Sequence, residues 1–203
     1  CSSDLAYALD REAIVLHLLK KQARVADGML PPENWAYSSR KKRYAYDPTR
    51  AARLLDRAGL TDPDGPGPRP RITFTYKTTT QDLARRTAEA IAGQLAAVGI
   101  RVEISSYDWA TFFDDIRRGR FHLYSLQWVG ITDPDLYRQV LHSDMQPPAG
   151  SNRAHYRNAR VDRLTVRAAT SVLGPARKRL YARVQRLEAR ELPYVPLWWP
   201  ERV

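Results

Sequence analysis

The chain has 203 residues, enough for one ordinary domain or a large part of a bigger protein. Hydrophobic residues make up 43% and charged residues 27%, as in globular domains, and no apolar run reaches the roughly 18 to 20 residues of a membrane span. The net charge is +11, a surplus found in proteins that bind nucleic acids or anionic membranes. Here the basic residues are spread over every expected helix, and the densest run is only Arg40-Lys41-Lys42-Arg43. We therefore interpret the charge as a solvated surface.

The first part of the chain predicts two helices separated by a turn-rich stretch. Leu5–Lys20 carries its apolar residues near one face of a helix. Prolines at 31–32 break regular structure after it. Asp47 can cap a second helix whose first position suits Pro48, and Gly59 ends that helix.

The middle of the chain alternates strands and helices. We expect strands at 71–77, 100–105 and 121–129, which are rich in β-branched and aromatic residues. Helices at 81–98 and 109–118 separate them. This order and spacing predict an α/β fold with crossover connections and a mainly parallel sheet flanked by helices.

Helices dominate the last third. One is expected to open at Asp133, and two more cover 158–170 and 175–190. The segment 193–199, PYVPLWW, is apolar and extended, and its two prolines keep it out of a central strand.

No residue pattern indicates catalysis or metal binding. The four histidines are never three or four residues apart, so the chain lacks a helical metal pair. It also lacks a nucleophile elbow, a phosphate loop and a dinucleotide fingerprint. Asp114 and Asp115 are adjacent, so on a helix they point about 100° apart, which fits a polar face better than paired catalytic carboxyls. We expect no enzyme, no cofactor and no metal.

Two tryptophans point to a candidate ligand site. Trp109 follows the second expected strand, and Trp128 ends the third. In parallel α/β sheets, ligands gather at the carboxyl ends of strands. A single tryptophan is more often a core residue, so position alone leaves both interpretations open.

A series of motifs resembles a known family. In chain order they are LAYALDREAIV, YDPTRAARLLDRAG, ITFTYK, QLAAVGIRVEI, WATFFDDIRRGRFHLYSLQWVGITDPD, NRAHYRNARVDRL, the Arg177-bearing helix and LPYVPLWWP. They cover almost everything from about Leu5 to Val203. They resemble the C-terminal part of extracytoplasmic solute-binding proteins of ABC importers, in the dipeptide-, oligopeptide- and nickel-binding family 5. Each motif alone is weak, but their shared order is specific.

The resemblance implies one lobe of a type II periplasmic-binding-protein fold, in which two α/β lobes joined by a hinge enclose the ligand. Residues 6–190 would form the second, C-terminal lobe, and 191–203 would return towards the first. A lipoprotein also begins with Cys, but its anchor would precede the first lobe, whereas Cys1 directly precedes a second-lobe helix. A common sequencing-adapter end translates to Cys-Ser-Ser-Asp-Leu, so we interpret residues 1–5 as adapter sequence.

The resemblance also implies a function. The expected ligand is a small solute, in first place a peptide, delivered to ABC transporter permease subunits at the periplasmic or extracytoplasmic face of the bacterial membrane. Membrane association would come only through the permease or a lipid anchor outside this chain, and no nucleic acid is expected. Two alternatives stay open: a basic nucleic-acid-binding module, and a receptor for a non-peptide solute such as a sugar or an opine-like compound.

The resemblance assigns ligand contacts to four positions. In peptide-binding members, aromatic residues matching Trp109 and Trp128 line the ligand cavity. The backbone matching Val129 and Gly130 borders it. Strand-like backbone can pair with an extended peptide whatever its side chains are.

The sequence departs from the family where peptide charges are held. Peptide binders place an Asp three residues after the second tryptophan, where it pairs with the peptide ammonium group. Here that position is Ile131, or falls in a one-residue gap before Asp133, so both residues are candidate ligand contacts. Arginines that meet the peptide carboxylate in some members correspond to Ile116 and Ser125. The ends of a free peptide therefore have no evident partner in this chain.

Overall fold

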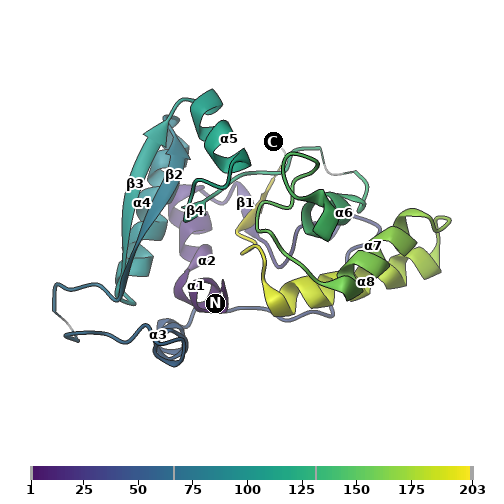
Figure 1. The fold of residues 1–203 in the computed structure, drawn as a ribbon. Coiled ribbons are helices and arrows are strands. Elements are labelled where there is room, and N and C mark those ends of the chain that lie inside the picture. Colours follow the sequence, from purple (N-terminus) through teal and green to yellow (C-terminus); the bar gives the residue numbers. More distant parts are fainter. Residues whose placement is uncertain (1, 66, 131, 202–203) are drawn as a thin grey trace. The chain divides into compact units, whose positions relative to one another are not determined.

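The chain forms two compact units in a computed structural model that describes residues 2–65, 67–130 and 132–201 (Figure 1). Unit 1 comprises residues 1–25, 44–126 and 197–203, and unit 2 comprises 26–43 and 127–196. Cys1, with which the proposed adapter segment begins, lies outside the described residues.

Unit 1 is built around a parallel sheet. Its elements are α1 (Ser2–Ala8), α2 (Arg11–Ala13), the π-helical turn η1 (Ile14–Leu18), β1 (Ala23–Val25), α3 (Pro48–Arg57), β2 (Ile72–Thr79), α4 (Asp82–Ala96), β3 (Ile100–Tyr107), α5 (Trp109–Arg117), β4 (Leu123–Tyr124) and β5 (Trp198–Pro200). The sheet has the order β3-β2-β4, with β2 parallel to both neighbours. The predicted mainly parallel sheet is thereby confirmed. A separate antiparallel pair, β1 with β5, keeps the C-terminal apolar segment out of this sheet.

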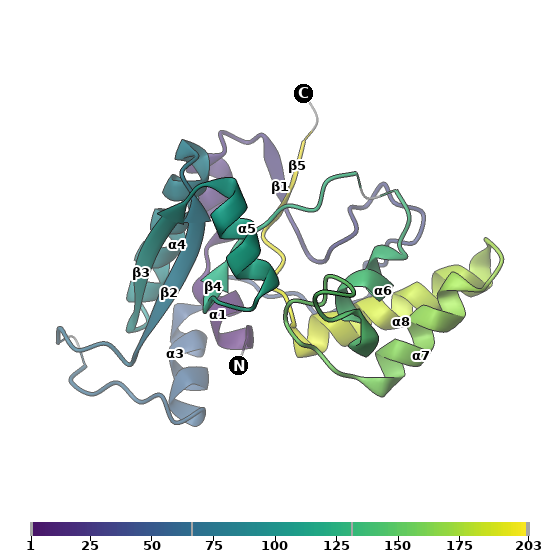
Figure 2. The ribbon, with the colours of Figure 1, turned by 45° about the horizontal axis from the view of Figure 1, so that its top comes forward.

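Two helices cover the sheet from opposite sides. α4 leads from β2 to β3, and α5 leads back past β2 towards β4. Because parallel crossovers are right-handed, helices that return in opposite directions along a sheet lie on opposite faces. Figures 1 and 2 show this arrangement. Ile91 and Leu95 of α4 and Phe112 and Ile116 of α5 are buried and belong to the core of unit 1.

Local capping signals in the sequence are confirmed. The Asp47 carboxylate accepts a hydrogen bond from the Arg50 backbone N–H at 2.8 Å, and Pro48 begins α3. Gly59 follows the end of α3 with a φ of +83°, a conformation that favours glycine. These signals are local, so the sequence alone was sufficient to predict them.

The predicted helix over Leu5–Lys20 is wrong as a continuous element. α1 ends at Ala8, and the Asp10 carboxylate then caps α2 by accepting from the Ala13 N–H at 2.9 Å. The Asp10 N–H donates to Gln94 Oε1 of α4 at 2.8 Å. A hydrogen bond to α4 thus replaces a backbone hydrogen bond within the predicted helix. The periodicity of apolar residues cannot predict this replacement.

The predicted strand over 121–129 is also wrong in extent. Only Leu123–Tyr124 forms a strand, opposite Tyr76 and Lys77 of β2. The following residues, 125–130, have no regular structure, because the chain leaves unit 1 after Leu126. Trp128 therefore does not end a strand.

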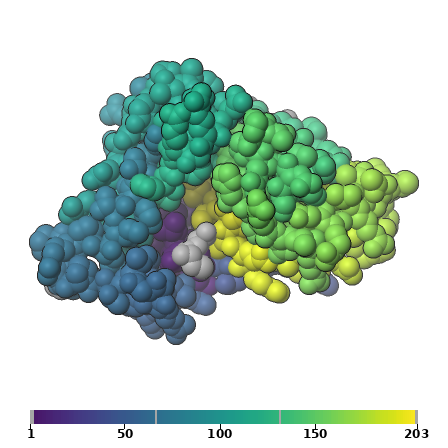
Figure 3. Space-filling model, in the orientation of Figure 1, coloured from purple at the N-terminus to yellow at the C-terminus, as the bar shows by residue number. Residues whose placement is uncertain are grey.

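Unit 2 is helical. Its elements are α6 (Leu136–Leu141), the 3-10 turn η2 (Ser143–Met145), α7 (Ala159–Ala169) and α8 (Pro175–Glu191). α7 and α8 form one surface of this unit (Figure 3). Its core joins them to α6 and to the 26–43 segment through Leu30, Ala36, Tyr137, Val140, Leu141, Val161, Leu164, Ala168, Leu180, Tyr181, Val184 and Leu187. No helix in the described part of the chain has the length and apolar content that crossing a membrane requires.

A buried ionisable group lies in the middle of α8. Glu188 is buried, and burial raises the pKa of its carboxyl from 4.5 to about 7. The Lys41 ammonium and the neighbouring Tyr137 hydroxyl lower that pKa, while the Asp27 charge raises it. The Lys41 side chain is itself fully buried and pairs with Asp27 at 2.9 Å. Unit 2 thus holds its 26–43 segment against α8 partly by buried charges.

The pKa of Glu188 predicts a pH-dependent stability. Between pH 4.5 and about 7, the folded chain keeps a proton that the unfolded chain has lost, so stability falls as pH rises. Over that window the loss is roughly 3 kcal/mol in the free energy of unfolding. Glu188→Gln should remove this slope, as measured by urea unfolding at several pH values. The exposed Glu89→Gln is the matched control, and equal slopes for Glu188→Gln and the unsubstituted chain would contradict the assignment.

Candidate functional site

The carboxyl ends of β2 and β3 lie side by side in unit 1, where Thr79 pairs in register with Tyr107. Asp108 follows and caps α5. Its carboxylate accepts from the Thr111 hydroxyl at 2.6 Å and from the Ala110 and Thr111 N–H groups at 2.9 and 3.1 Å. The Thr111 hydroxyl bond and these N–H bonds hold the pKa of Asp108 below its ordinary value. The cap fixes where α5 begins, and Trp109 is its first residue.

Trp109 is exposed, with 58% of its surface open to solvent. Its indole stacks on the Phe113 ring, with centroids 5.5 Å apart and planes 12° apart. It also contacts the buried Phe112 at a centroid distance of 5.9 Å. The indole therefore packs on two phenylalanine rings while most of its surface is exposed to solvent. This does not fit the alternative that Trp109 is a core residue.

The sequence analysis did not identify an ion pair between β2 and α5. Lys77, near the carboxyl end of β2, pairs with Asp115 of α5, and its ammonium lies 5.1 Å from the Tyr107 ring centroid. The hydrogen bond from Lys77 holds the pKa of Asp115 below its ordinary value. Asp114 pairs with Arg118 at 2.9 Å. Both carboxylates thus have cationic partners, which argues against a catalytic acid at this helix. The residue types at 71–77 predicted a strand that contains Lys77. No sequence pattern near Lys77 could identify a partner 38 residues away.

Trp128, Val129 and Gly130 belong to unit 2. The half-buried Trp128 packs against the core of this unit, and the Arg153 guanidinium lies 5.2 Å from its ring centroid. Val129 is 84% exposed, and Gly130 has a φ of +72°, so a side chain at position 130 would strain the backbone. Ile131 lies outside the described residues.

Asp133 lies in a cluster around Arg177 that the sequence analysis did not identify. The Arg177 guanidinium donates to the carboxylates of Asp133 and Asp135, each at 3.2 Å. It also lies 5.4 Å from the Trp35 ring centroid. Tyr181 donates its hydroxyl to Asp135, and burial together with that bond raises the pKa of Tyr181. The Asp133 carboxylate therefore already has a cationic partner.

The comparisons with known proteins identify the family. Residues 5–145 match the model of the bacterial extracellular solute-binding proteins, family 5 (middle region). The chain belongs to this family. The prediction made from its ordered motifs is thus confirmed.

A solved relative confirms the fold. The oligopeptide-binding protein AppA of Bacillus subtilis, in complex with a nonapeptide, superimposes with a TM-score of 0.88 at 27% identity. The match covers 98% of this chain and 41% of that one. The fold is that of the type II periplasmic-binding proteins, as predicted.

Two curated relatives show that family similarity does not fix one ligand. Di/tripeptide-binding protein 2 of Pseudomonas aeruginosa (strain UCBPP-PA14) is 28% identical over 197 residues, which cover 97% of this chain and 36% of the relative. Heme-binding protein A of Haemophilus influenzae is 27% identical over 194 residues, which cover 95% and 35%. The chain therefore spans about a third of the length of these relatives. Both are named as binding proteins.

The Lys77–Asp115 pair gives a direct test of the electrostatics near Trp109. Replacing Lys77 with Met removes the hydrogen bond that favours the ionised carboxylate, so the pKa of Asp115 should rise towards its ordinary value. Carboxyl carbon NMR titration measures this change. Asp108 provides an internal control, because its lowered pKa comes from Thr111 and the backbone and should not move. An unchanged Asp115 titration would show that the pair does not form in solution.

Proposed function

We propose that this chain contributes to the ligand site of a receptor that binds a small solute, in first place a peptide, and delivers it to ABC importer permease subunits. The observation that carries this proposal is the family match over residues 5–145. The nonapeptide in complex with AppA and the name of the P. aeruginosa relative support the choice of a peptide. The place of action would be the periplasmic or extracytoplasmic face of the cell membrane.

In this proposal Trp109 supplies an apolar platform. An indole stacked on Phe113 loses little freedom when a solute covers its open face, so the buried apolar area stabilises the complex. In a two-lobed receptor, ligand contacts that exist only in the closed form shift the population towards closure. The closed form would then be the one that the permease recognises.

The segment 127–130 would supply backbone contacts. Its residues make no backbone hydrogen bond to other residues in the described ranges. Their N–H and C=O groups can therefore pair with an extended peptide, which is indifferent to the peptide's side chains. Trp128, Val129 and Gly130 are proposed members of the site on this basis, and Ile131 is proposed on the family resemblance alone.

Asp133 can bind a solute only if its carboxylate contacts both Arg177 and the solute, or if the solute replaces Arg177 as its partner. Its carboxylate accepts from Arg177 and also from the Asp135 N–H at 2.8 Å. A peptide ammonium would have to compete with both. This engagement favours, as a second candidate, a solute without a free ammonium group, and the name of the heme-binding relative is in line with that candidate.

The platform is tested in the full receptor, expressed from its complete reading frame. Trp109→Ala should weaken binding of a defined mixture of di- and tripeptides about 10- to 100-fold by isothermal titration calorimetry, because a stacked aromatic contact is lost. The matched control is Leu83→Ala, which removes another exposed apolar side chain of unit 1. Peptide binding unaffected by Trp109→Ala would contradict the platform, and binding of hemin in place of every peptide would move the ligand to the second candidate.

Asp133 is tested by comparing free and N-acetylated forms of the same peptide. We expect Asp133→Asn to change the affinity for either form less than about threefold, because the carboxylate is engaged by Arg177. A selective loss of more than tenfold for the free-amine peptide would show that Asp133 holds the ammonium after exchange.

A further inference from the structure

The excess of positive charge is concentrated in one unit. Unit 2 holds 16 Lys and Arg against 8 Asp and Glu, a net charge of +8, whereas unit 1 holds 17 against 14. Basic residues are nearly equal in number in the two units, and the surplus over acidic residues is larger in unit 2 because that unit has fewer acidic residues. The Arg40-Lys41-Lys42-Arg43 run, which the charge pattern assigned to a solvated surface, belongs to the basic unit.

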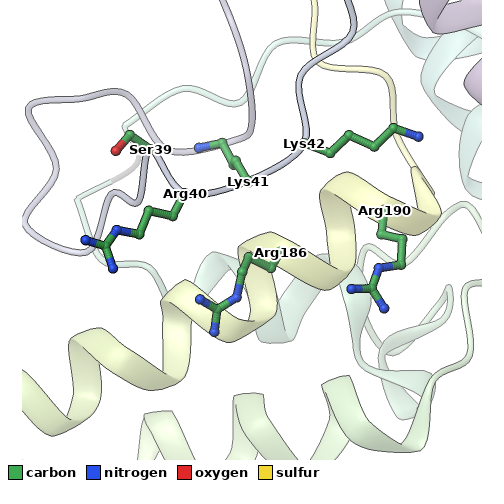
Figure 4. A pocket seen from close by; sticks show the side chains of 6 residues that line it. All are labelled: Ser39, Arg40, Lys41, Lys42, Arg186 and Arg190. Atoms are coloured by element: carbon green, nitrogen blue, oxygen red, sulfur yellow. The ribbon is translucent and has the colours of Figure 1, made fainter.

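Part of this charge converges on a groove. Its volume is about 370 Å³, and it is lined by Ser39, Arg40, Lys41, Lys42, Arg186 and Arg190 (Figure 4). The figure shows Arg186 and Arg190 on α8 beside the segment that carries Arg40 and Lys42. Among the residues that the structure describes, no acidic side chain lines the groove.

The groove is held by buried contacts. Gln185 of α8 is buried, donates to the Ala36 C=O at 2.8 Å and accepts from the Ser38 N–H at 3.1 Å. Lys41 is buried, pairs with Asp27 and donates to the Ser38 C=O at 2.8 Å. The segment that carries Arg40 is thus fixed on both sides. Its place beside α8 does not depend on a ligand.

Three arginines of the groove lack an acidic partner. Arg40, Arg186 and Arg190 are exposed, and within residues 2–65, 67–130 and 132–201 none forms an ion pair. Of the two acidic residues of α8, Glu188 is buried, and Glu191 accepts from Tyr156 at 2.6 Å and Asn158 at 2.9 Å. Like charges gathered without counter-charges repel, and a bound anion relieves that repulsion.

We propose that this groove binds a phosphate-bearing anion, either the headgroup of an anionic phospholipid or a free phosphate. Guanidinium groups match phosphate oxygens with paired, charge-assisted hydrogen bonds, and three of them border the groove. A nucleic acid is the weaker choice, because the described lining of the groove holds no aromatic side chain to stack a base. The proposal does not rest on the proposed solute site, with which the groove shares no residue.

The test uses the full receptor, expressed from its complete reading frame, with two probes. Inorganic phosphate is titrated by calorimetry, and phosphatidylcholine vesicles with and without phosphatidylglycerol are tested by co-sedimentation at low salt. Arg186→Gln with Arg190→Gln should weaken binding about tenfold or more, since two charge-assisted contacts are lost. The control is Arg53→Gln with Arg57→Gln, which removes the same charge from α3 of unit 1 and should change binding less than about twofold. Both pairs are exposed, and thermal unfolding by circular dichroism checks that each variant is folded.

The outcomes separate the sources of phosphate. Saturable binding of inorganic phosphate that also displaces the vesicles identifies a free-phosphate site, and binding only to phosphatidylglycerol vesicles identifies a headgroup site. Equal losses in the groove and control variants would overturn the proposal in favour of net charge alone. Failure of both probes to bind would overturn it too. If neither phosphate nor vesicles bind, a filter-binding result would also overturn the proposal. That result is salt-dependent retention of duplex DNA that the groove variant loses and the control variant keeps.

Discussion

The ion pair between the buried Lys41 side chain and the partly buried Asp27 carboxylate constrains the 26–43 segment of unit 2. A fully buried ammonium needs a compensating charge and hydrogen-bond acceptors, and Lys41 finds them in Asp27 and the Ser38 C=O. Glu188 adds a third ionisable group nearby, whose charge responds to both partners. Asp27, Ser38 and Lys41 all belong to the 26–43 segment, so these contacts fix its local course, and Gln185 of α8 joins it to the helix through Ala36 and Ser38. The core of the unit and the groove are both built on that placement.

The parts of the fold that local chemistry determines could be read from the sequence. Asp47 and Asp108 cap helices because a short polar side chain reaches the free N–H groups of the next turn, wherever the helix lies in the fold. Helix α8 and the parallel strands followed from periodicity and spacing in the same way. The break at Asp10 did not, because it depends on Gln94, and residues 84 positions apart leave no mark on each other's local pattern.

In the candidate site, too, the sequence indicated the positions of some residues, whereas their contacts became known only from the fold. Position after a strand indicated Trp109, but only the folded chain shows that its indole is stacked and open. The family resemblance indicated Asp133, but Arg177, which neutralises it, comes from a helix 44 residues further along the chain. The concentration of charge in unit 2 was invisible for a related reason: basic residues spread along a sequence gather once segments 26–43 and 127–196 fold together.

The pairing of β1 with β5 has a consequence for how this chain acquires its structure. Ala23 lies opposite Pro200, so the first strand finds its partner among the last described residues. Closing a loop of that length carries an entropic cost, but the cost grows only with the logarithm of the number of residues enclosed. Synthesis proceeds from the N-terminus, so the pairing of β1 with β5 can form only after every residue between the two strands has been made. Before that point the backbone groups of β1 lack β5 as a partner, and an unpaired strand edge is the kind of surface that chaperones shield in a nascent protein.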